Sequence, residues 1–218
     1  MKRITVLILA MTLAACATNR VASERNYSGF LDDYSKLEVV EFENGSSGLV
    51  WFADNLPKGK YTRAIIDPTI VYPEPRRDSE EARVFIRDIL DYVDATLQSS
   101  IGRELIITDN PGPDTVRFQF AITTVEISTE GLSGLDYVPV ATLWAGVTTV
   151  AGTRDQQVEM FVEGRVLDSQ TGKLLGQTVK RGYGRSLENR STTLTKDDLY
   201  PLLDSWVGDA GNVGRSLK

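Results

Sequence analysis

The feature that most constrains the fold is a long alternating pattern on the two sides of a turn near residue 170. In a strand, successive side chains point to opposite faces, and before the turn Val158, Met160 and Val162 would share one face while Glu159, Phe161 and Glu163 would share the other. The turn itself is Asp168–Lys173, in which Asp168 can accept hydrogen bonds from the backbone that follows it and Gly172 can adopt a positive φ. Leu174 begins a return strand. The pattern predicts a β-hairpin, and therefore a sheet on which the rest of the chain must pack.

Other segments are predicted to be extended. Val116, Phe118, Phe120 and Ile122 alternate with residues that are more polar or smaller, which is typical of a half-buried strand. Residues 49–56 and 60–72 are predicted as strands, and Leu105–Thr108 as a short apolar strand. Because a proline cannot donate to a ladder, Pro68 predicts that the segment 60–72 is an edge strand or is broken there.

Two helices are predicted with clear apolar stripes. Residues 78–102 begin with a capping-box pattern at Asp78 and Glu81 and end at Gly102. The stripe of this helix consists of Ala82, Phe85, Ile86, Ile89, Val93 and Leu97. A second stripe closes the chain: Leu199, Leu202, Leu203, Trp206, Val207, Ala210 and Val213. Pro201 is expected in the first turn of that helix, where its missing N–H is tolerated.

Two other segments are less regular. Tyr27, Phe30, Leu31, Tyr34 and Leu37 follow helical spacing, so we predict a short helix capped by Ser28 whose aromatic side packs on the core. Residues 137–152 carry no charge and fit either a strand or one face of a helix. They form part of the core or an apolar surface patch, and they are too rich in Thr and Gly to be a membrane span.

Together these elements predict an α+β fold. We expect a mixed or mostly antiparallel sheet of about four to six strands, with the long helix and the C-terminal helix packed on one face. Residues 27–218 are expected to form a single domain, which is an ordinary size for a chain of 218 residues.

The composition excludes several functional classes. The chain has no histidine and one cysteine, Cys16, so intrachain disulfides and Cys/His metal sites are impossible. The formal net charge of −6 argues against a nucleic-acid partner, which requires a basic face. We therefore expect neither a metal site nor a cofactor, and no binding of nucleic acid.

Cys16 occupies a diagnostic place near the N-terminus. Met1–Arg3 is a short basic start, and Ile4–Ala15 is an uncharged apolar run of the length found in secretory signals. The run ends in Leu13, Ala14, Ala15 and Cys16, which resembles the lipobox of bacterial lipoproteins. The resemblance implies that residues 1–15 are a signal peptide cleaved before Cys16, that the Cys16 sulfur carries a diacylglycerol, and that the new amine is acylated, for example with palmitate.

This resemblance also implies a location. Two or more buried acyl chains hold a protein firmly on a bilayer without spanning it. Residues 16–26 are predicted to be a lipidated flexible tether, with the domain held near the membrane surface. Ala17, the residue after the cysteine, is consistent with export to the outer membrane, facing the periplasm. The predicted partners are thus the lipid bilayer and an envelope protein, and the sequence leaves the oligomeric state open.

The folded part resembles a family of bacterial lipoproteins of unknown function, DUF3313. The resemblance rests on the lipobox, the Gly-Phe-Leu-x-Asp-Tyr-Ser stretch from Gly29 to Ser35, the segment Tyr137–Pro139 and the Asp-x-x-Thr-Gly turn of Asp168–Gly172. The family has no established activity, so the resemblance implies location and fold but transfers no catalytic residue.

No catalytic motif is present in the sequence. "QTGKLL" lacks the upstream glycine and the Ser or Thr of a phosphate-binding loop. "GLSGL" (residues 131–135) lacks the order of a hydrolase nucleophile elbow, and no histidine exists to activate a serine. Acidic pairs such as Asp197 and Asp198 fall at helix starts, where they complement the helix dipole.

The sequence therefore favours a non-enzymatic accessory or adaptor lipoprotein with a periplasmic binding surface. Two alternatives stay open: a carrier of a small apolar ligand, and a cell-wall hydrolase that uses two carboxylates. The candidate partner surface comprises Gly29, Phe30, Leu31, Asp33, Tyr34, Tyr137, Pro139 and Trp144.

Overall fold

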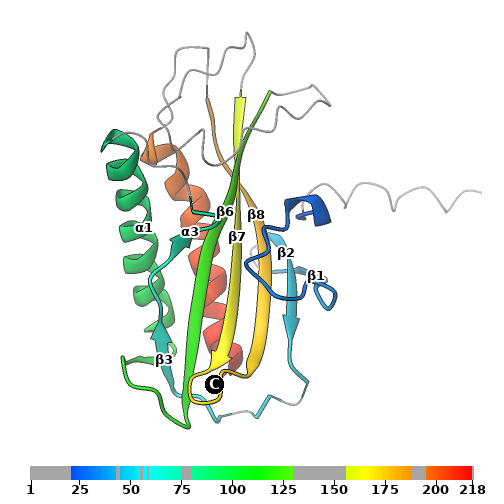
Figure 1. The fold of residues 1–218 in the computed structure, drawn as a ribbon, viewed down its shortest axis with the longest axis vertical. Helices are drawn as coiled ribbons and strands as arrows, with labels where there is room; N and C mark the ends of the chain where they lie inside the picture. Colours follow the sequence, from blue (N-terminus) through cyan, green and yellow to red (C-terminus); the bar gives the residue numbers. More distant parts are fainter. Residues whose placement is uncertain are drawn as a thin grey trace, which may run out of the picture.

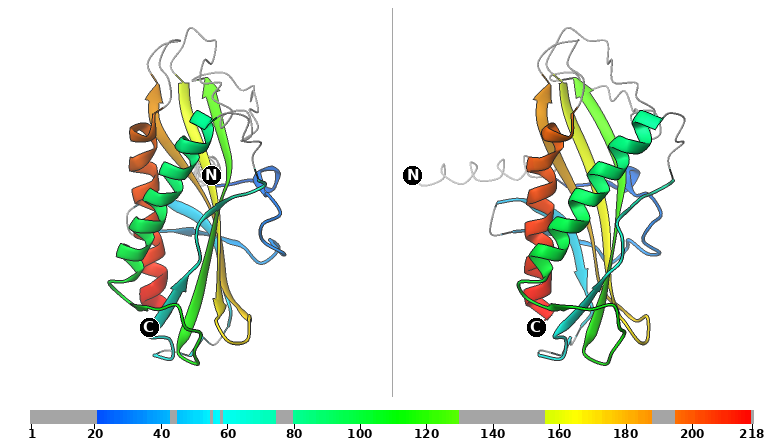
Figure 2. Two further views of the ribbon diagram at one scale, coloured as in Figure 1. Left: turned by 60° about the vertical axis from the view of Figure 1, so that its left-hand side comes forward. Right: turned by 90° about the vertical axis from the view of Figure 1, so that its left-hand side faces the viewer.

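A sheet with two helices on one face forms the framework of the protein (Figures 1 and 2). The computed structural model describes residues 21–42, 45–54, 56–57, 59–74, 80–129, 156–187 and 195–217. The helices are α1 (Glu80–Ile101) and α3 (Lys196–Leu217). The predicted α+β class, the two helices and their common face are thus confirmed.

The sheet is larger than predicted, with eight strands in the described residues instead of four to six. They are β1 (Glu38–Glu41), β2 (Ser47–Phe52), β3 (Arg63–Ile66), β4 (Ile70–Val71), β5 (Ile106–Ile107), β6 (Thr115–Thr129), β7 (Gln156–Asp168) and β8 (Leu174–Leu187). Their order is β1-β2-β8-β7-β6-β3-β5, with β4 also pairing with β6. The predicted strand at Leu105–Thr108 is confirmed as β5. The two extra strands are β1, whose four residues are all exposed and so show no alternation, and the two-residue β4, which is separated from β3 within the predicted segment 60–72.

The pairing is mostly antiparallel. β1, β2, β8, β7 and β6 form antiparallel ladders with their neighbours, whereas β3 runs parallel to β5 and β6, and β4 runs parallel to β6. Helix α1 lies in the chain between β4 and β5, and so supplies the long connection that parallel strands require.

The predicted hairpin is confirmed as β7–β8. At its turn, Asp168 Oδ1 accepts hydrogen bonds from the backbone N–H groups of Gln170 (3.2 Å) and Thr171 (3.0 Å). Gly172 has φ of 70°, the left-handed conformation that favours glycine. This turn fixes the register between β7 and β8, which have 13 and 14 residues.

The two faces of the sheet are both covered. Met160 and Val166 of β7 point toward the helices and join a core that includes Ile89 and Leu203. Phe161 of the same strand belongs to a second cluster on the opposite face. That second cluster is closed by the N-terminal segment 21–37, which contributes Ala22 and Leu31.

The predicted helix over residues 27–37 is wrong. The segment holds a 3-10 turn at Glu24–Asn26, followed by bends and turns. Gly29 has φ of 88°, and the backbone N–H groups of Gly29 and Leu31 donate to the Tyr34 hydroxyl at 2.8 and 3.3 Å, in place of helical bonds. The aromatic residues pack on the sheet as expected, but they do so from an irregular segment.

The helix ends follow the sequence in part. Helix α1 ends at Ile101, and a Cβ on Gly102 would lie 2.6 Å from the Gln98 carbonyl oxygen, so glycine suits the predicted stop. Pro201 is the sixth residue of α3 and not in the first turn. The helix starts earlier because Asp198 accepts hydrogen bonds from the backbone N–H and the hydroxyl of Thr195.

The break predicted at Pro68 is confirmed, since β3 ends before Pro68 and β4 begins after it.

Some predictions concern residues outside the described part of the chain. These are the lipobox with Cys16, the capping residue Asp78, and the segment 137–152 with Tyr137, Pro139 and Trp144.

Candidate functional site

A cavity lies between the sheet and the helices, and glycines shape its floor. Phe120 of β6 is paired across the ladder with Gly164 of β7, and a Cβ at Gly164 would lie 2.7 Å from the Phe120 ring. Phe52 of β2 has the same relation to Gly176 of β8, where the corresponding distance is 2.6 Å. The two glycines therefore let each aromatic ring lie directly over the neighbouring strand.

The roof of the cavity comes from both helices. Val93 and Leu97 of α1 and the inward face of α3, including Leu203 and Ala210, line it. The helices are close enough that a Cβ on Gly211 of α3 would meet the Ser100 hydroxyl of α1 at 2.5 Å. Figure 2 shows the two helices side by side over the sheet.

The cavity has a volume of about 610 Å³, within the range of small-molecule sites. Its inner end is made by buried apolar side chains of α1, α3 and β6, whereas the lining residues at its other end are exposed. The exposed ones are Lys36, Glu38, Val40, Asp54, Asn212 and Ser216, and we call these six residues the mouth. The mouth therefore lies between the β1–β2 edge of the sheet and the last turns of α3.

One wall of the cavity contains a buried ion pair. Lys180 of β8 contacts the Asp209 carboxylate of α3, and their side chains are 5% and 4% exposed. The hydroxyl of Ser46 lies 3.2 Å from the Lys180 ammonium, and the Phe42 ring centroid lies 3.9 Å from it. Burial lowers the pKa of Lys180 to about 8, while the neighbouring carboxylate acts in the opposite direction. The pair links α3 to the sheet beside the cavity.

The buried polar groups that line the cavity behind its mouth have partners within the protein. The Thr178 hydroxyl donates to the Leu49 carbonyl at 3.0 Å, and the Gln177 amide donates to the carbonyl of Asp33 at 2.5 Å. In the described part of the chain, the buried side-chain polar atoms without a hydrogen bond belong to Thr69 and Arg117, and neither lines the cavity. Arg117 is satisfied in another way, since its Nε lies 3.2 Å from an oxygen of Asp67.

Five of the predicted partner-surface residues lie on the other face of the sheet. Tyr34 donates to Glu163 Oε2 at 2.6 Å, and the Ser28 backbone N–H donates to Glu163 Oε1 at 2.8 Å. Leu31 is 2% exposed. These contacts bind the segment to the chain's own sheet, while Gly29 and Asp33 are exposed.

Phe30 completes this arrangement. Its ring lies 5.1 Å from the guanidinium carbon of Arg165 and 5.8 Å from the ring of Tyr72. The stretch from Gly29 to Ser35 thus docks the N-terminal segment onto β7 through the buried Glu163. We call this arrangement the clamp.

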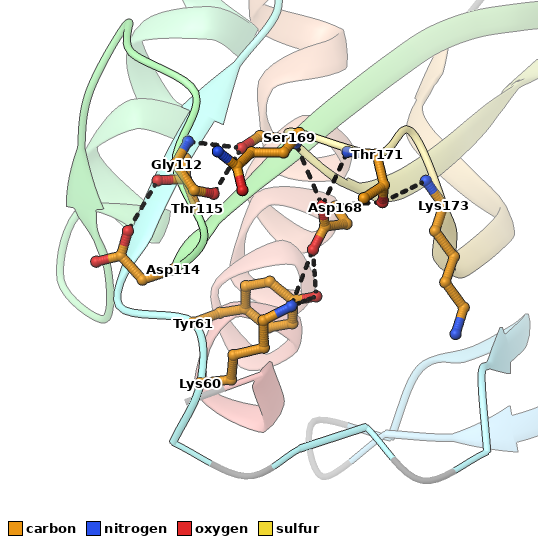
Figure 3. Close-up of polar contacts among 10 residues, drawn as sticks. Lys60, Tyr61, Gly112, Asp114, Thr115, Asp168, Ser169, Thr171 and Lys173 are labelled. Carbon is orange, nitrogen blue, oxygen red and sulfur yellow. Dashed lines mark hydrogen bonds and ion pairs between the residues drawn. The ribbon is translucent and has the colours of Figure 1, made fainter.

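Polar side chains around Asp168 hold the hairpin turn against the residues that precede β3 (Figure 3). Lys60 Nζ and the Tyr61 hydroxyl donate to Asp168 Oδ2 at 3.0 and 2.9 Å. Burial alone would raise the pKa of Asp168, but the hydrogen bonds from Lys60, the Thr171 N–H and Tyr61 hold that pKa below its usual range. Because each donor serves to fix a loop, this group is structural.

The described residues lack two features that would point to other functions. They contain no group of three or more His, Cys, Asp or Glu side chains arranged to hold a metal ion. None of the helices formed by these residues has the length and apolarity needed to cross a membrane.

Comparison with known proteins identifies the family. The family described as "Protein of unknown function (DUF3313)" matches residues 26–210. The chain belongs to this family. Among DUF3313-like relatives, the uncharacterized lipoprotein YdcL of Escherichia coli strain K12 is 28% identical over 208 residues, covering 95% of this chain and 93% of the relative.

Solved structures give a weaker likeness. A minor lipoprotein from Acinetobacter baumannii is 9% identical and covers 72% of this chain and 92% of that one, with a TM-score of 0.36. The hypothetical protein CT253 from Chlamydia trachomatis is 11% identical, covers 72% of this chain and 99% of that one, and has a TM-score of 0.38. At these scores neither carries a conclusion about this DUF3313 protein.

Sequence reasoning left a carrier of a small apolar ligand open as an alternative, but it assigned no residues to a cavity, and it missed the ion pair. Lys180 stands in the return strand of the hairpin and Asp209 in the apolar stripe of the last helix, 29 residues later, and no local spacing connects them. The one available signal was an acidic residue beside the apolar face of a helix, which is a common surface pattern.

Proposed function

We propose that this protein is a membrane-anchored lipoprotein of the bacterial cell envelope that binds a small apolar ligand in the cavity beneath α3, without catalysing a reaction. The cavity carries the proposal, because it is about 610 Å³ in volume and the buried polar groups that line it behind the mouth are paired within the protein. A site with no free donors or acceptors along its walls favours a hydrocarbon, since a polar ligand would lose its hydrogen bonds to water there.

The anchor is proposed from the sequence and the relatives. The lipobox ending at Cys16 supports lipidation, and a relative that covers 95% of this chain is called a lipoprotein. We propose that the acylated Cys16 holds the domain on the periplasmic side of the outer membrane.

A hydrolase is less well supported. The buried carboxylate of the cavity, Asp209, is bound by Lys180, and the other two carboxylates that line it, Glu38 and Asp54, lie at the exposed mouth. A glycoside hydrolase needs one carboxyl group kept protonated by its surroundings and a second one opposite it across the substrate. The adaptor role stays a prediction, because the segment that suggested it is largely engaged by the clamp.

The proposal can be tested in a membrane. The full lipoprotein is reconstituted into phospholipid vesicles with an uncharged long-chain alcohol that carries a photoreactive diazirine on its chain. After irradiation, labelled peptides are mapped by mass spectrometry. We expect labels on α3 between Leu203 and Val213 and on the facing residues of β6.

A matched pair of variants tells cavity binding from surface labelling. Ala210→Trp places a large ring into the cavity, because Ala210 is buried and lines it. Ser205→Trp places the same ring on the exposed side of the same helix. We expect Ala210→Trp to remove the labels on the cavity residues and Ser205→Trp to keep them. Equal labelling in the two variants, with both folded by circular dichroism, would contradict the proposal.

A further inference from the structure

The shape of the cavity limits what it can hold. Its lining residues run from the edge strand β1 to β6, across four strand spacings, a distance of about 19 Å. A volume of about 610 Å³ spread over that length makes the cavity long and narrow, which is the shape of an extended hydrocarbon chain.

The inner end of the cavity suits the end of such a chain. Phe118, Ile122 and Leu203 are buried and apolar there, as are Val93 and Leu97 of α1. A saturated chain entering from the mouth would meet hydrocarbon along this path, and the Lys180–Asp209 pair on the wall is already mutually neutralised. The polar end of the ligand would therefore remain at the mouth.

The mouth carries charges of both signs. Lys36 lies with its ammonium 5.1 Å from the Trp51 ring centroid, while Glu38 and Asp54 are exposed carboxylates without an ion pair among the described residues. Asn212 and Ser216 of α3 add an amide and a hydroxyl. This set is complementary to a headgroup that has one anionic and one cationic part, the first directed to Lys36 and the second to the carboxylates.

We infer that the ligand is a single-chain zwitterionic phospholipid, whose chain lies in the cavity and whose phosphate and ammonium groups lie at the mouth beside Lys36, Glu38 and Asp54. This inference rests on the proposed function, and it adds the class of ligand. Single-chain zwitterionic phospholipids partition into the bilayers formed by their two-chain counterparts, so for a protein anchored on a membrane the ligand need not cross the aqueous phase.

The experiment compares three photoreactive lipids that share one diazirine-bearing chain. Their headgroups are phosphoethanolamine, phosphoglycerol and uncharged glycerol, each on a lysolipid incorporated at the same low fraction into vesicles with the full lipoprotein. We expect the phosphoethanolamine lipid to label the cavity residues about two- to fivefold more than either of the others, which is the size of effect that exposed charge pairs produce. Raising the salt to 1 M should reduce this preference, because exposed charges are then screened.

Variants at the mouth test the direction of the preference. Lys36→Glu should lower labelling by the phosphoglycerol lipid more than labelling by the glycerol lipid. Asp54→Lys should remove the advantage of phosphoethanolamine over phosphoglycerol. Asp109→Lys, at an exposed position that does not line the cavity, makes the same change of charge elsewhere and should leave the ratio unchanged.

The possible results distinguish an error in the inferred headgroup from an error in the proposed binding site. Equal cavity labelling by all three lipids, or a preference for phosphoglycerol, would overturn the inferred headgroup and leave the apolar binding site in place. Failure of all three lipids, and of the long-chain alcohol, to label the cavity would overturn the site itself.

Discussion

The buried ion pair between Lys180 and Asp209 makes a quantitative prediction about stability. Both side chains are almost completely buried, at 5% and 4% exposure. Removing one member of such a pair leaves the other charge without compensation, at a cost of about 3–5 kcal/mol. We therefore expect Lys180→Met, and separately Asp209→Leu, to lower the free energy of unfolding by about 3–5 kcal/mol each.

The double variant should behave differently. Replacing both charges with apolar side chains of similar size is often neutral or stabilising, so we expect a loss of less than about 1 kcal/mol. The coupling energy from the double-mutant cycle would then be roughly 5 kcal/mol or more, a large fraction of the stability of an ordinary domain. Denaturant unfolding of the four proteins, followed by circular dichroism, gives the required free energies.

The pH dependence supplies a second readout. Burial lowers the pKa of Lys180 to about 8, and in an unfolded chain lysine has a pKa of about 10.4. Between these values the unfolded state binds a proton that the folded state lacks, so the contribution of Lys180 to stability rises with pH. The rise should be largest in Asp209→Leu, where no carboxylate holds the ammonium in its charged form.

A control comes from an exposed pair. Arg215 and Glu104 lie 3.0 Å apart, with the arginine 66% exposed, and their cycle should give less than about 1 kcal/mol. If the costs of the two buried single variants simply add in the double variant, the pair does not act as a unit, and the reasoning about the cavity wall fails.

Three further predictions follow from other contacts. Gly164→Ala should lower the free energy of unfolding by about 1–3 kcal/mol, and with it the melting temperature, because the new Cβ would lie 2.7 Å from the Phe120 ring on the cavity floor. Gly208→Ala, where nothing lies within 4 Å of the new Cβ, should raise the melting temperature. Glu163→Ala should speed amide hydrogen exchange in residues 21–37 more than in β7 and β8, because the clamp loses its hydrogen-bond acceptor. An equal increase in the exchange rates of both regions would contradict this. The hydrogen bond to the Asp204 carboxylate, together with burial, raises the pKa of Tyr92 to about 12, so Tyr92 should ionise near that pH in absorbance titrations corrected with Tyr92→Phe, and at a lower pH in Asp204→Asn.

Periodicity in the sequence predicted the elements that have a strong pattern, and local contacts decided the others. The hairpin, α1 and α3 were predicted because their apolar spacing is set by burial of one face, and the structure has that burial. The helix over residues 27–37 was wrong because its spacing matched a helix by chance while the Tyr34 hydroxyl and Glu163 satisfied the backbone instead.

The cavity could not be predicted for a related reason. Phe52, Phe120, Gly164 and Gly176 are ordinary strand residues in the sequence, and only the register of two ladders brings each ring over a glycine. An alternating pattern indicates which face is apolar, but it does not indicate whether the opposing helix fills the space above it. Empty volume depends on how side chains from distant elements meet, and a single sequence does not contain that information in readable form.

The position of the clamp connects the proposed anchor with the proposed ligand. Ala22 is buried in the cluster that contains Leu49 of β2, so the docked part of the chain begins within a few residues of Cys16. Six residue steps span at most about 22 Å, which would hold this face of the sheet near the headgroups if Cys16 is acylated. Besides β7, the docked segment contacts β2 through Leu49, and β2 pairs directly with β1, which carries Glu38 of the mouth. The same hairpin would thus be held near the bilayer by the anchor and would open the cavity at that edge, which is the arrangement expected of a protein that takes its ligand from the membrane.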